Sequence, residues 1–299
     1  MGRVVAVDIG GTTIKSATAD TPASLAETTI HDVRRTPTPI GDARALIDAV
    51  VDVVRSYGSG VDAVGVVMPG LLDVDNGRVR IAGNLRLVDE PIAGPIAAAL
   101  GIPVHFEHDG RAGALAEFKA GAARGMRDAA VMTLGTGVAA SFIIDGALRN
   151  GAGFMGEIGH AHVGPEVPCV CGHSGCLEAV ASASAIARRY EQRTGTPSDS
   201  ADVIRRAAAG DAIAAEVWED ALRGLVLAGS WIANMLGPEA IIITGGLALA
   251  GETLFAPMRS GLAAALTYQR VPEIIGATHQ ADAGCLGAAI LALQGEGCS

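Results

Sequence analysis

Short apolar runs alternate along this chain with Ala-rich or amphipathic stretches of helical length. The apolar run 4–7 and the alternating segment 14–18 flank a turn of small residues, which predicts a β-hairpin. A third strand is expected over residues 27–34 and a helix over residues 42–57. Strands that alternate with helices in this way are typical of the α/β class.

The alternation continues through the first half of the chain. The pattern predicts a buried strand over 62–68, a polar hairpin over 71–83, a helix over 90–101 and a strand over 102–109. The first of these strands ends at Pro69 and Gly70. The last one ends on Asp109, which lies at the mouth of the next predicted helix.

The plan of the first hairpin recurs in residues 129–146, so that Asp8 aligns with Thr133 and Gly10 with Gly135. After this second hairpin, the pattern predicts three helices up to about Met235. A buried strand with a Gly-Gly turn and a helix then follow over 239–251, a last strand over 271–277 and a closing helix from Gly284.

An internal repeat of this kind predicts two similar domains. We expect the first over residues 1–117, completed by the helix 284–299, and the second over 118–283. Each domain would open on a hairpin whose Gly/Thr turn can cradle a phosphate through backbone N–H groups. A nucleotide in a cleft between the domains would meet both turns. The alternative is a chance resemblance between two glycine-rich hairpins.

Composition narrows the class of protein. The 299 residues are 49% hydrophobic and 18% charged, which is enough to bury a large core. A formal net charge of -10 argues against nucleic-acid binding as the main function. The N-terminus has no apolar signal run, and no apolar stretch has the length needed to span a bilayer. We therefore expect a soluble, cytoplasmic protein, in which disulfides are rare.

Residues 160–178, HAHVGPEVPCVCGHSGCLE, hold three of the five cysteines. Such a cluster can serve as a disulfide, a catalytic thiol or a metal site, and the expected location favours metal. Three thiolates and one imidazole suit a closed tetrahedral zinc site, with His160, Cys169, Cys171 and Cys176 as the candidate ligands. His162 and His173 are alternatives for the imidazole, and a set of ordinary buried cysteines is the alternative to a metal site. Cys285 and Cys298 are expected only to pack.

Five motifs then resemble one family: DIGGTTIK, TLGTGV, GEIGH, CVCGHSGCLE and IIITGG, in this order. Together they are similar to the ROK family of sugar kinases and related repressors. The resemblance covers essentially the whole chain. It implies an actin-like ATPase fold with two RNase H-like α/β domains around a cleft. It also implies a structural Zn²⁺ and the ATP- and Mg²⁺-dependent phosphorylation of a hexose or an N-acylhexosamine.

For the sugar, the resemblance implies Asp109 as the general base that takes the hydroxyl proton. The implied sugar-binding residues are Gly70, His108, Asp109, Glu157, His160 and Glu178. The His160 ring would also bind the metal, so that the zinc loop would fix the two glutamates. The alternatives are an ordinary N-cap for Asp109, solvated charges for the glutamates and a simple turn at Gly70.

For the nucleotide, the two hairpin turns would wrap the phosphates and Asp8 would hold Mg²⁺ through water. The implied cofactor-binding residues are Asp8, Gly10, Gly11, Thr12, Thr13, Lys15, Thr133, Gly135, Thr136, Gly137, Gly245 and Gly246. The last two would form the turn on the adenosine side. Lys15 as an ordinary strand lysine and Gly245-Gly246 as a plain connection are the alternatives. A polyphosphate donor is possible in principle, but the second turn favours a nucleotide.

One position departs from the family. His108 stands where its members mostly carry an Asn that touches a sugar hydroxyl, and Arg111 stands where another small polar residue is common. The leading prediction is a glucokinase that forms glucose 6-phosphate, and a kinase for an N-acylhexosamine or another hexose is the alternative. A sugar-sensing regulator is less favoured, because such proteins generally carry an N-terminal helix-turn-helix domain ahead of the hairpin. Dimers are common in the family, so a homodimer or higher homo-oligomer is expected.

Overall fold

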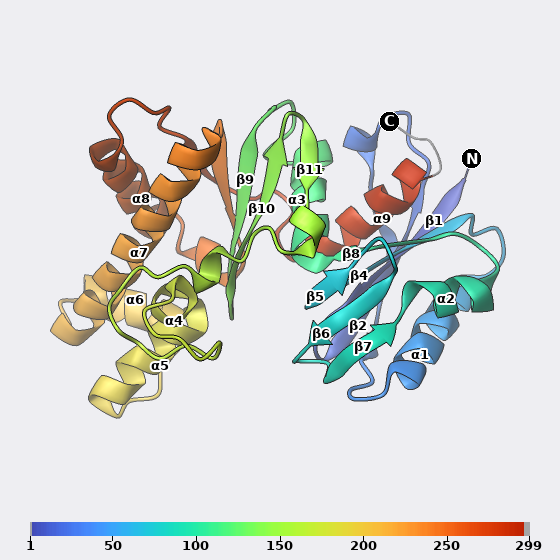
Figure 1. Ribbon diagram of the computed structural model, residues 1–299, viewed down its shortest axis with the longest axis horizontal. Coiled ribbons are helices and arrows are strands. Elements are labelled where there is room, and N and C mark those ends of the chain that lie inside the picture. Colours follow the sequence, from blue (N-terminus) through green and yellow to red (C-terminus); the bar gives the residue numbers. More distant parts are fainter. Residues whose placement is uncertain (1, 296–299) are drawn as a thin grey trace. The chain divides into compact units, whose positions relative to one another are not determined.

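The computed structural model of the protein describes residues 2–295 (Figure 1). Within them the chain forms two compact units. Unit 1 comprises residues 2–125, 150–154 and 281–295, and unit 2 comprises residues 126–149 and 155–280. Each unit has its own five-stranded sheet and its own hydrophobic core. The division into folding domains at 117/118 and 283/284 stays a prediction.

The sheet of unit 1 has the strand order β3 (His31–Pro37), β2 (Thr13–Asp20), β1 (Arg3–Ile9), β4 (Ala63–Met68) and β8 (Val104–His108). Strand β1 runs antiparallel to β2 and parallel to β4. A second, three-stranded sheet contains β5 (Leu71–Asp73), β6 (Arg78–Ala82) and β7 (Leu87–Pro91).

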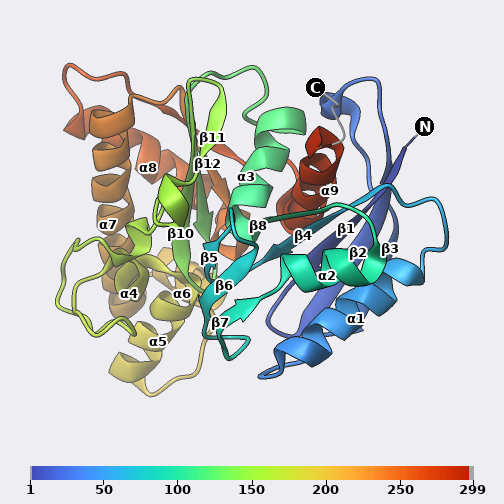
Figure 2. The ribbon, with the colours of Figure 1, turned by 45° about the vertical axis from the view of Figure 1, so that its right-hand side comes forward.

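Four helices complete unit 1, namely α1 (Ala43–Arg55), α2 (Ala93–Leu100), α3 (Asp109–Ala120) and α9 (Ala283–Gly295). Figure 2 shows α1 and α2 on one side of the larger sheet and α9 on the other. Strand β4 explains this, because successive residues point to opposite faces. Val64 and Val66 share a core with Leu46 of α1, whereas Gly65 faces α9. A Cβ at Gly65 would lie 1.8 Å from the carbonyl oxygen of Ala288, so only glycine allows this close approach.

The five-stranded sheet of unit 2 has the same topology as the larger sheet of unit 1. Its order is β11 (Ala147–Arg149), β10 (Val138–Ile144), β9 (Ala129–Leu134), β12 (Ala240–Thr244) and β13 (Glu273–Gly276). Strand β9 runs antiparallel to β10 and parallel to β12, as β1 does to β2 and β4. The internal repeat read from the sequence is therefore present as two sheets of the same topology.

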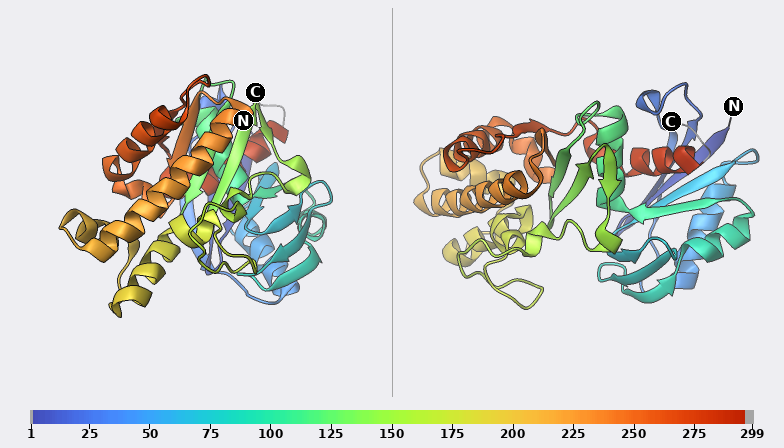
Figure 3. Two further views of the ribbon diagram at one scale, coloured as in Figure 1. Left: turned by 60° about the vertical axis from the view of Figure 1, so that its left-hand side comes forward. Right: turned by 45° about the horizontal axis from the view of Figure 1, so that its top comes forward.

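The helices of unit 2 are α4 (Leu177–Ala181), α5 (Ala183–Thr194), α6 (Ser200–Ala208), α7 (Ala212–Leu236) and α8 (Glu252–Ala265). Helices α7 and α8 lie side by side (Figure 3). Their buried faces join one core with β9 and β12, in which Met132 and Ile243 meet Leu225 and Leu262. Among the described residues, no helix combines the length and apolar character that crossing a bilayer requires.

Several predicted elements need correction. The third strand begins at His31 rather than at residue 27, because Leu25–Glu27 form a 3-10 turn that the Ser24 hydroxyl caps. Four helices, not three, lie between the cysteine loop and residue 236. Ser182 adopts an extended conformation after α4 and its hydroxyl accepts the Ala185 N–H, which starts α5 separately. The short strands β7 and β11 were not expected.

Candidate active site

The carboxyl ends of three neighbouring strands bring the predicted residues of unit 1 together. Asp8 of β1 pairs with Val67 of β4, and Met68 of β4 pairs with His108 of β8. Asp8, the Pro69-Gly70 turn and Asp109 therefore lie at the carboxyl ends of parallel strands, at the same edge of the sheet. Ligands in open α/β sheets bind outside this edge.

The first hairpin turn is held in shape by its neighbours. The Gly10 N–H donates to the Thr13 carbonyl at 3.0 Å, and the Thr38 hydroxyl donates to the Gly10 carbonyl at 2.8 Å. A Cβ on Gly11 would lie 3.3 Å from Nδ2 of Asn84, so the Asn84 amide lies against the turn. The sequence analysis did not single out Asn84, and its only signal is a polar residue in the loop after a predicted hairpin.

The carboxyl group of Asp8 is largely buried and lies near both Asp109 and Lys15. Burial and, to a smaller extent, the Asp109 carboxylate raise the pKa of this carboxyl group to about 6, against the opposing effect of Lys15. The Lys15 ammonium itself donates to the Ala281 carbonyl at 3.0 Å and forms an ion pair with Asp282. Lys15 is thus already paired inside unit 1, and its predicted phosphate contact would require this pair to open.

The junction between β8 and α3 places Asp109 as the first residue of the helix. The N-cap is His108, whose Nδ1 accepts the Gly110 N–H at 3.1 Å. The same N–H donates to Oδ1 of Asp109 at 2.6 Å. The alternative of Asp109 as the N-cap is therefore wrong, and its side chain remains 37% exposed, open to a substrate. Gly70 has φ +120°, and a Cβ there would lie 2.5 Å from the Ile81 carbonyl oxygen, so the position requires glycine.

In unit 2, the corresponding edge carries the second turn. The Gly135 N–H donates to the Gly137 carbonyl at 3.0 Å, and Thr133 pairs with Thr244 across the parallel ladder. Gly245, with φ +87°, follows Thr244 at once, and a Cβ there would lie 2.5 Å from the Leu134 carbonyl oxygen. The two predicted turns are thus in contact.

A pocket of about 300 Å³ opens beside this edge. It lies between α6 and the 3-10 segment Gly246–Ala250 that follows β12. Its lining includes Ala201, Ile204 and Leu247 as apolar groups and Arg205 and Thr253 as polar ones. This mixture of an apolar wall and a few polar groups suits a flat heterocycle.

Three residues of the predicted sugar site lie in unit 2. Glu178 is in the first turn of α4, and its Oε2 accepts the Val138 N–H at 3.0 Å. Glu157 begins the 3-10 turn Ile158–His160, and its Oε2 lies 3.9 Å from Nε2 of His160. Glu178 is therefore held beside the second turn, and Glu157 beside the imidazole of the cysteine loop.

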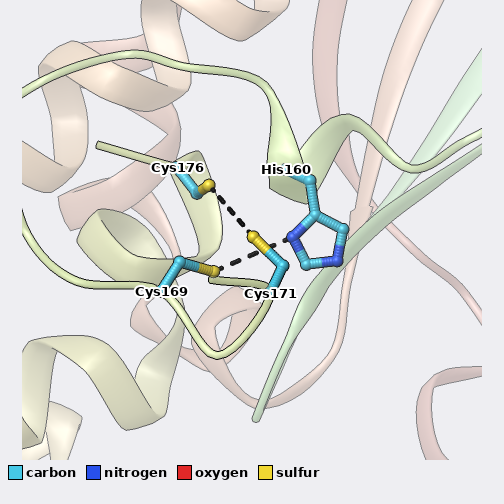
Figure 4. Close-up of side chains that lie close together, drawn as sticks. All are labelled: His160, Cys169, Cys171 and Cys176. Carbon is cyan, nitrogen blue, oxygen red and sulfur yellow. Dashed lines mark hydrogen bonds between the residues drawn. The ribbon is translucent and has the colours of Figure 1, made fainter. Parts of the chain in front are cut away.

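Figure 4 shows the side chains of this loop, His160, Cys169, Cys171 and Cys176. Their four donor atoms lie within 4.8 Å of one another. Nδ1 of His160 is 3.8 Å from the Cys169 sulfur, and the sulfurs of Cys171 and Cys176 are 3.6 Å apart. Donors about 2.3 Å (sulfur) and 2.0–2.1 Å (nitrogen) from a tetrahedral Zn²⁺ would be roughly 3.6–3.8 Å apart. A disulfide would require about 2 Å.

The donor set therefore fits a closed zinc site and does not fit a disulfide. Burial raises the pKa of the Cys176 thiol to about 12, so a cation is needed to hold it as a thiolate. His162 is engaged elsewhere, because its Nε2 lies 2.9 Å from Oε1 of Glu166. Neither His162 nor His173 belongs to the group, and His160 supplies the imidazole.

Solved structures resemble this arrangement over nearly the whole chain. The ROK hexokinase of Thermus thermophilus superposes with a TM-score of 0.86 at 29% identity, over 98% of this chain and 99% of that one. The ROK family glucokinase of Streptomyces griseus, in complex with glucose and AMPPNP, gives a TM-score of 0.80 at 30% identity, over 98% and 100%. Together with the repeated sheet, these likenesses define an actin-like ATPase fold.

Sequence comparison gives the family. The ROK family matches residues 4–295. The glucokinase of Halalkalibacterium halodurans is 34% identical over 320 residues, which span 98% of this chain and 95% of that protein. The chain belongs to the ROK family.

Proposed function

We propose that this chain is an ATP-dependent sugar kinase that phosphorylates a hexose, with glucose as the leading substrate and glucose 6-phosphate as the product. The observation that carries the proposal is the placement of Asp109 as the partly exposed first residue of α3, at the strand edge that also carries Asp8. The glucokinase relative and the glucose and AMPPNP complex of the Streptomyces protein support the substrate and the donor.

Phosphoryl transfer asks a protein mainly for positioning and for neutralising charge. The free oxygen of the Asp109 carboxylate accepts the proton of the sugar hydroxyl. The hydroxyl oxygen then forms a bond to the γ-phosphorus of ATP, the bond from that phosphorus to the bridging oxygen breaks, and ADP leaves with the electron pair. Gly70, His108, Glu157, His160 and Glu178 would orient the sugar.

The residues around Asp8 fit a magnesium ion. The Asp109 carboxylate raises the pKa of the Asp8 carboxyl group, and the nearby Lys15 is already paired with Asp282. A divalent cation held by Asp8, directly or through water, would balance this charge. Mg²⁺ supplies charge neutralisation on the phosphate oxygens when it is bound.

The turns Gly10–Thr13 and Thr133–Gly137 would receive the phosphates through their N–H and hydroxyl groups. The pocket of about 300 Å³ beside Gly246 would take the adenine ring. In the cysteine loop, Zn²⁺ would act structurally, because its four ligands leave no open position. It would fix the His160 ring, whose Nε2 lies 3.9 Å from Oε2 of Glu157, on the side where the sugar would bind.

The decisive experiment measures ADP release from ATP and Mg²⁺ with glucose, mannose, fructose, allose, N-acetylglucosamine and N-acetylmannosamine. A strong preference for glucose supports the proposal, and a preference for an N-acyl sugar selects the alternative kinase. Asp109→Asn should abolish turnover while sugar binding, measured by calorimetry, persists. Turnover by Asp109→Asn would remove Asp109 as the base. Absence of turnover with all six sugars would favour a sugar sensor.

Three further expectations accompany this function. Two domains should close over the sugar and exclude water, and solution scattering with and without glucose and AMPPNP would detect this. We also expect a homodimer or a higher homo-oligomer, which sedimentation would reveal, and a cytoplasmic location.

A further inference from the structure

A buried ion pair brackets His108 and Asp109. Glu107 is the last residue but one of β8, and Arg111 is the third residue of α3. Both residues are almost wholly buried, at 7% and 4% exposed. Glutamate and arginine are rarely buried to this extent unless they are paired.

One oxygen atom joins the strand to the helix. Oε1 of Glu107 accepts a hydrogen bond from Nε of Arg111 at 2.7 Å. Nη2 of Arg111 lies 2.6 Å from the same oxygen, as an ionic contact rather than a well-directed hydrogen bond. This oxygen also accepts the backbone N–H of His108 at 2.6 Å. The chain on both sides of Asp109 is therefore tied to a single carboxylate oxygen.

The residues between Glu107 and Arg111 already contact one another in the ligand-free protein. The Gly110 N–H is shared between Nδ1 of His108 and Oδ1 of Asp109, which are 3.3 Å apart. Because Nδ1 accepts this N–H, the neutral ring carries its proton on Nε2 and can offer a substrate only a donor there. A Cβ on Gly110 would lie 3.2 Å from Cε1 of His108, so the ring packs on this glycine.

We propose that Glu107 and Arg111 are positioning residues for phosphoryl transfer: their pairing fixes the β8–α3 junction that aims the Asp109 carboxylate at the sugar hydroxyl. The inference rests on the proposed role of Asp109. A base displaced by about 1 Å loses up to ~100-fold in rate, so a rigid junction serves catalysis directly. A purely structural role makes a different prediction, because replacing both members of a buried ion pair by apolar residues is often neutral for stability.

The test is the double variant Glu107→Leu/Arg111→Met, which removes both charges together and leaves the His108 N–H without its acceptor. The matched control is Arg189→Met/Asp220→Leu, since Arg189 and Asp220 form another largely buried pair, 2.5 Å apart, in unit 2. Thermal unfolding, sugar affinity by calorimetry, and kcat and KM are measured for both variants. We expect kcat to fall ~10–100-fold in the first variant, with sugar affinity within about threefold of wild type and a Tm close to that of the control. Arg111→Lys, which keeps the charge, should recover part of kcat relative to Arg111→Met.

A wild-type kcat in the first double variant overturns the inference. The inference is also wrong if the control double variant shows the same fall in kcat. It is wrong as well if the fall in both variants only reflects a smaller amount of folded protein. Asp109→Asn separates this failure from that of the proposed function. If Asp109→Asn is inactive and the double variant is fully active, only the positioning role is wrong. If Asp109→Asn is active, Asp109 is not the base, and the positioning role that rests on it fails as well.

Discussion

A methyl group on the α-carbon of Gly284 would lie 2.6 Å from Oδ2 of Asp8. Gly284 is the second residue of α9, and Asp8 is the last residue but one of β1. The first turn of the last helix thus closes directly on the carboxylate that we assign to the Mg²⁺ site. The absence of a side chain at Gly284 is therefore part of the site.

Gly284→Ala should displace the Asp8 carboxylate, because neither the helix nor the strand can yield without disturbing the core. We expect kcat/KM for MgATP to fall by about tenfold or more, the effect of misplacing a catalytic group by a fraction of an ångström. Gly94→Ala in α2 is the control, since a Cβ there meets nothing within 4 Å. Equal kinetics for the two variants would contradict the close packing of α9 on Asp8.

Asp8→Asn should stabilise the ligand-free protein at neutral pH while abolishing turnover. The folded-state pKa of Asp8 is raised from 3.8 to about 6, so its ionised form opposes folding. The penalty is fully present above pH 6, shrinks as the pH falls from about 6 to 3.8, and is absent below that range. At pH 7.5 it amounts to at most about 3 kcal/mol. Denaturant unfolding at pH 7.5 and at pH 4 measures it, and a stabilisation that did not depend on pH would contradict this assignment.

Removing the metal should weaken sugar binding more than nucleotide binding. Cys176→Ser takes one donor from the group of four, so zinc content by mass spectrometry should fall and the KM for glucose should rise at least about tenfold. His162→Ala is the matched control, because His162 pairs with Glu166 outside the group. Loss of zinc in the His162 variant, or an unchanged glucose KM in zinc-free protein, would contradict the structural role of the ion.

Filling the pocket beside Gly246 should weaken ATP binding alone. Ala201 lines this pocket, and Ala201→Phe places a ring where we expect adenine. The KM for ATP should rise roughly tenfold with little change in the KM for glucose, because the new ring displaces the adenine, whose stacking contacts contribute about 0.5–1.5 kcal/mol. Ala209→Phe, at the exposed C-cap of α6, controls for an added aromatic group. An unchanged KM for ATP would move the adenine site elsewhere.

The sequence predicted those parts of the site that depend on local pattern. The turns at Gly10 and Gly135, the strand end at Gly70 and the helix start at Asp109 all follow from an apolar run that stops at a small or acidic residue. The cysteine loop was predictable as well, because thiol spacing is itself the signal.

Features that depend on contacts between distant residues could not be predicted from the sequence. The partner of Lys15 is Asp282, 267 positions along the chain, and no pattern links the two. Asn84 lies in a loop, where polar residues are common and carry no period. The Glu107–Arg111 pair spans a strand end and a helix start, so the helical i,i+4 rule does not foresee it. Strands β7 and β11 are short and mostly not buried, so they carry a weak alternation signal.

The order in which the chain builds unit 1 has a consequence for its synthesis. Residues 281–295 supply α9, which packs on β1 and β4 in the middle of the first sheet. When the first hairpin, Asp109 and the whole second sheet have been synthesised, the helix that covers Gly65 and closes on Asp8 is still missing. Unit 1 therefore cannot complete its packing until residues 281–295 have been made, and a chain that stops before them lacks the helix that closes on Asp8.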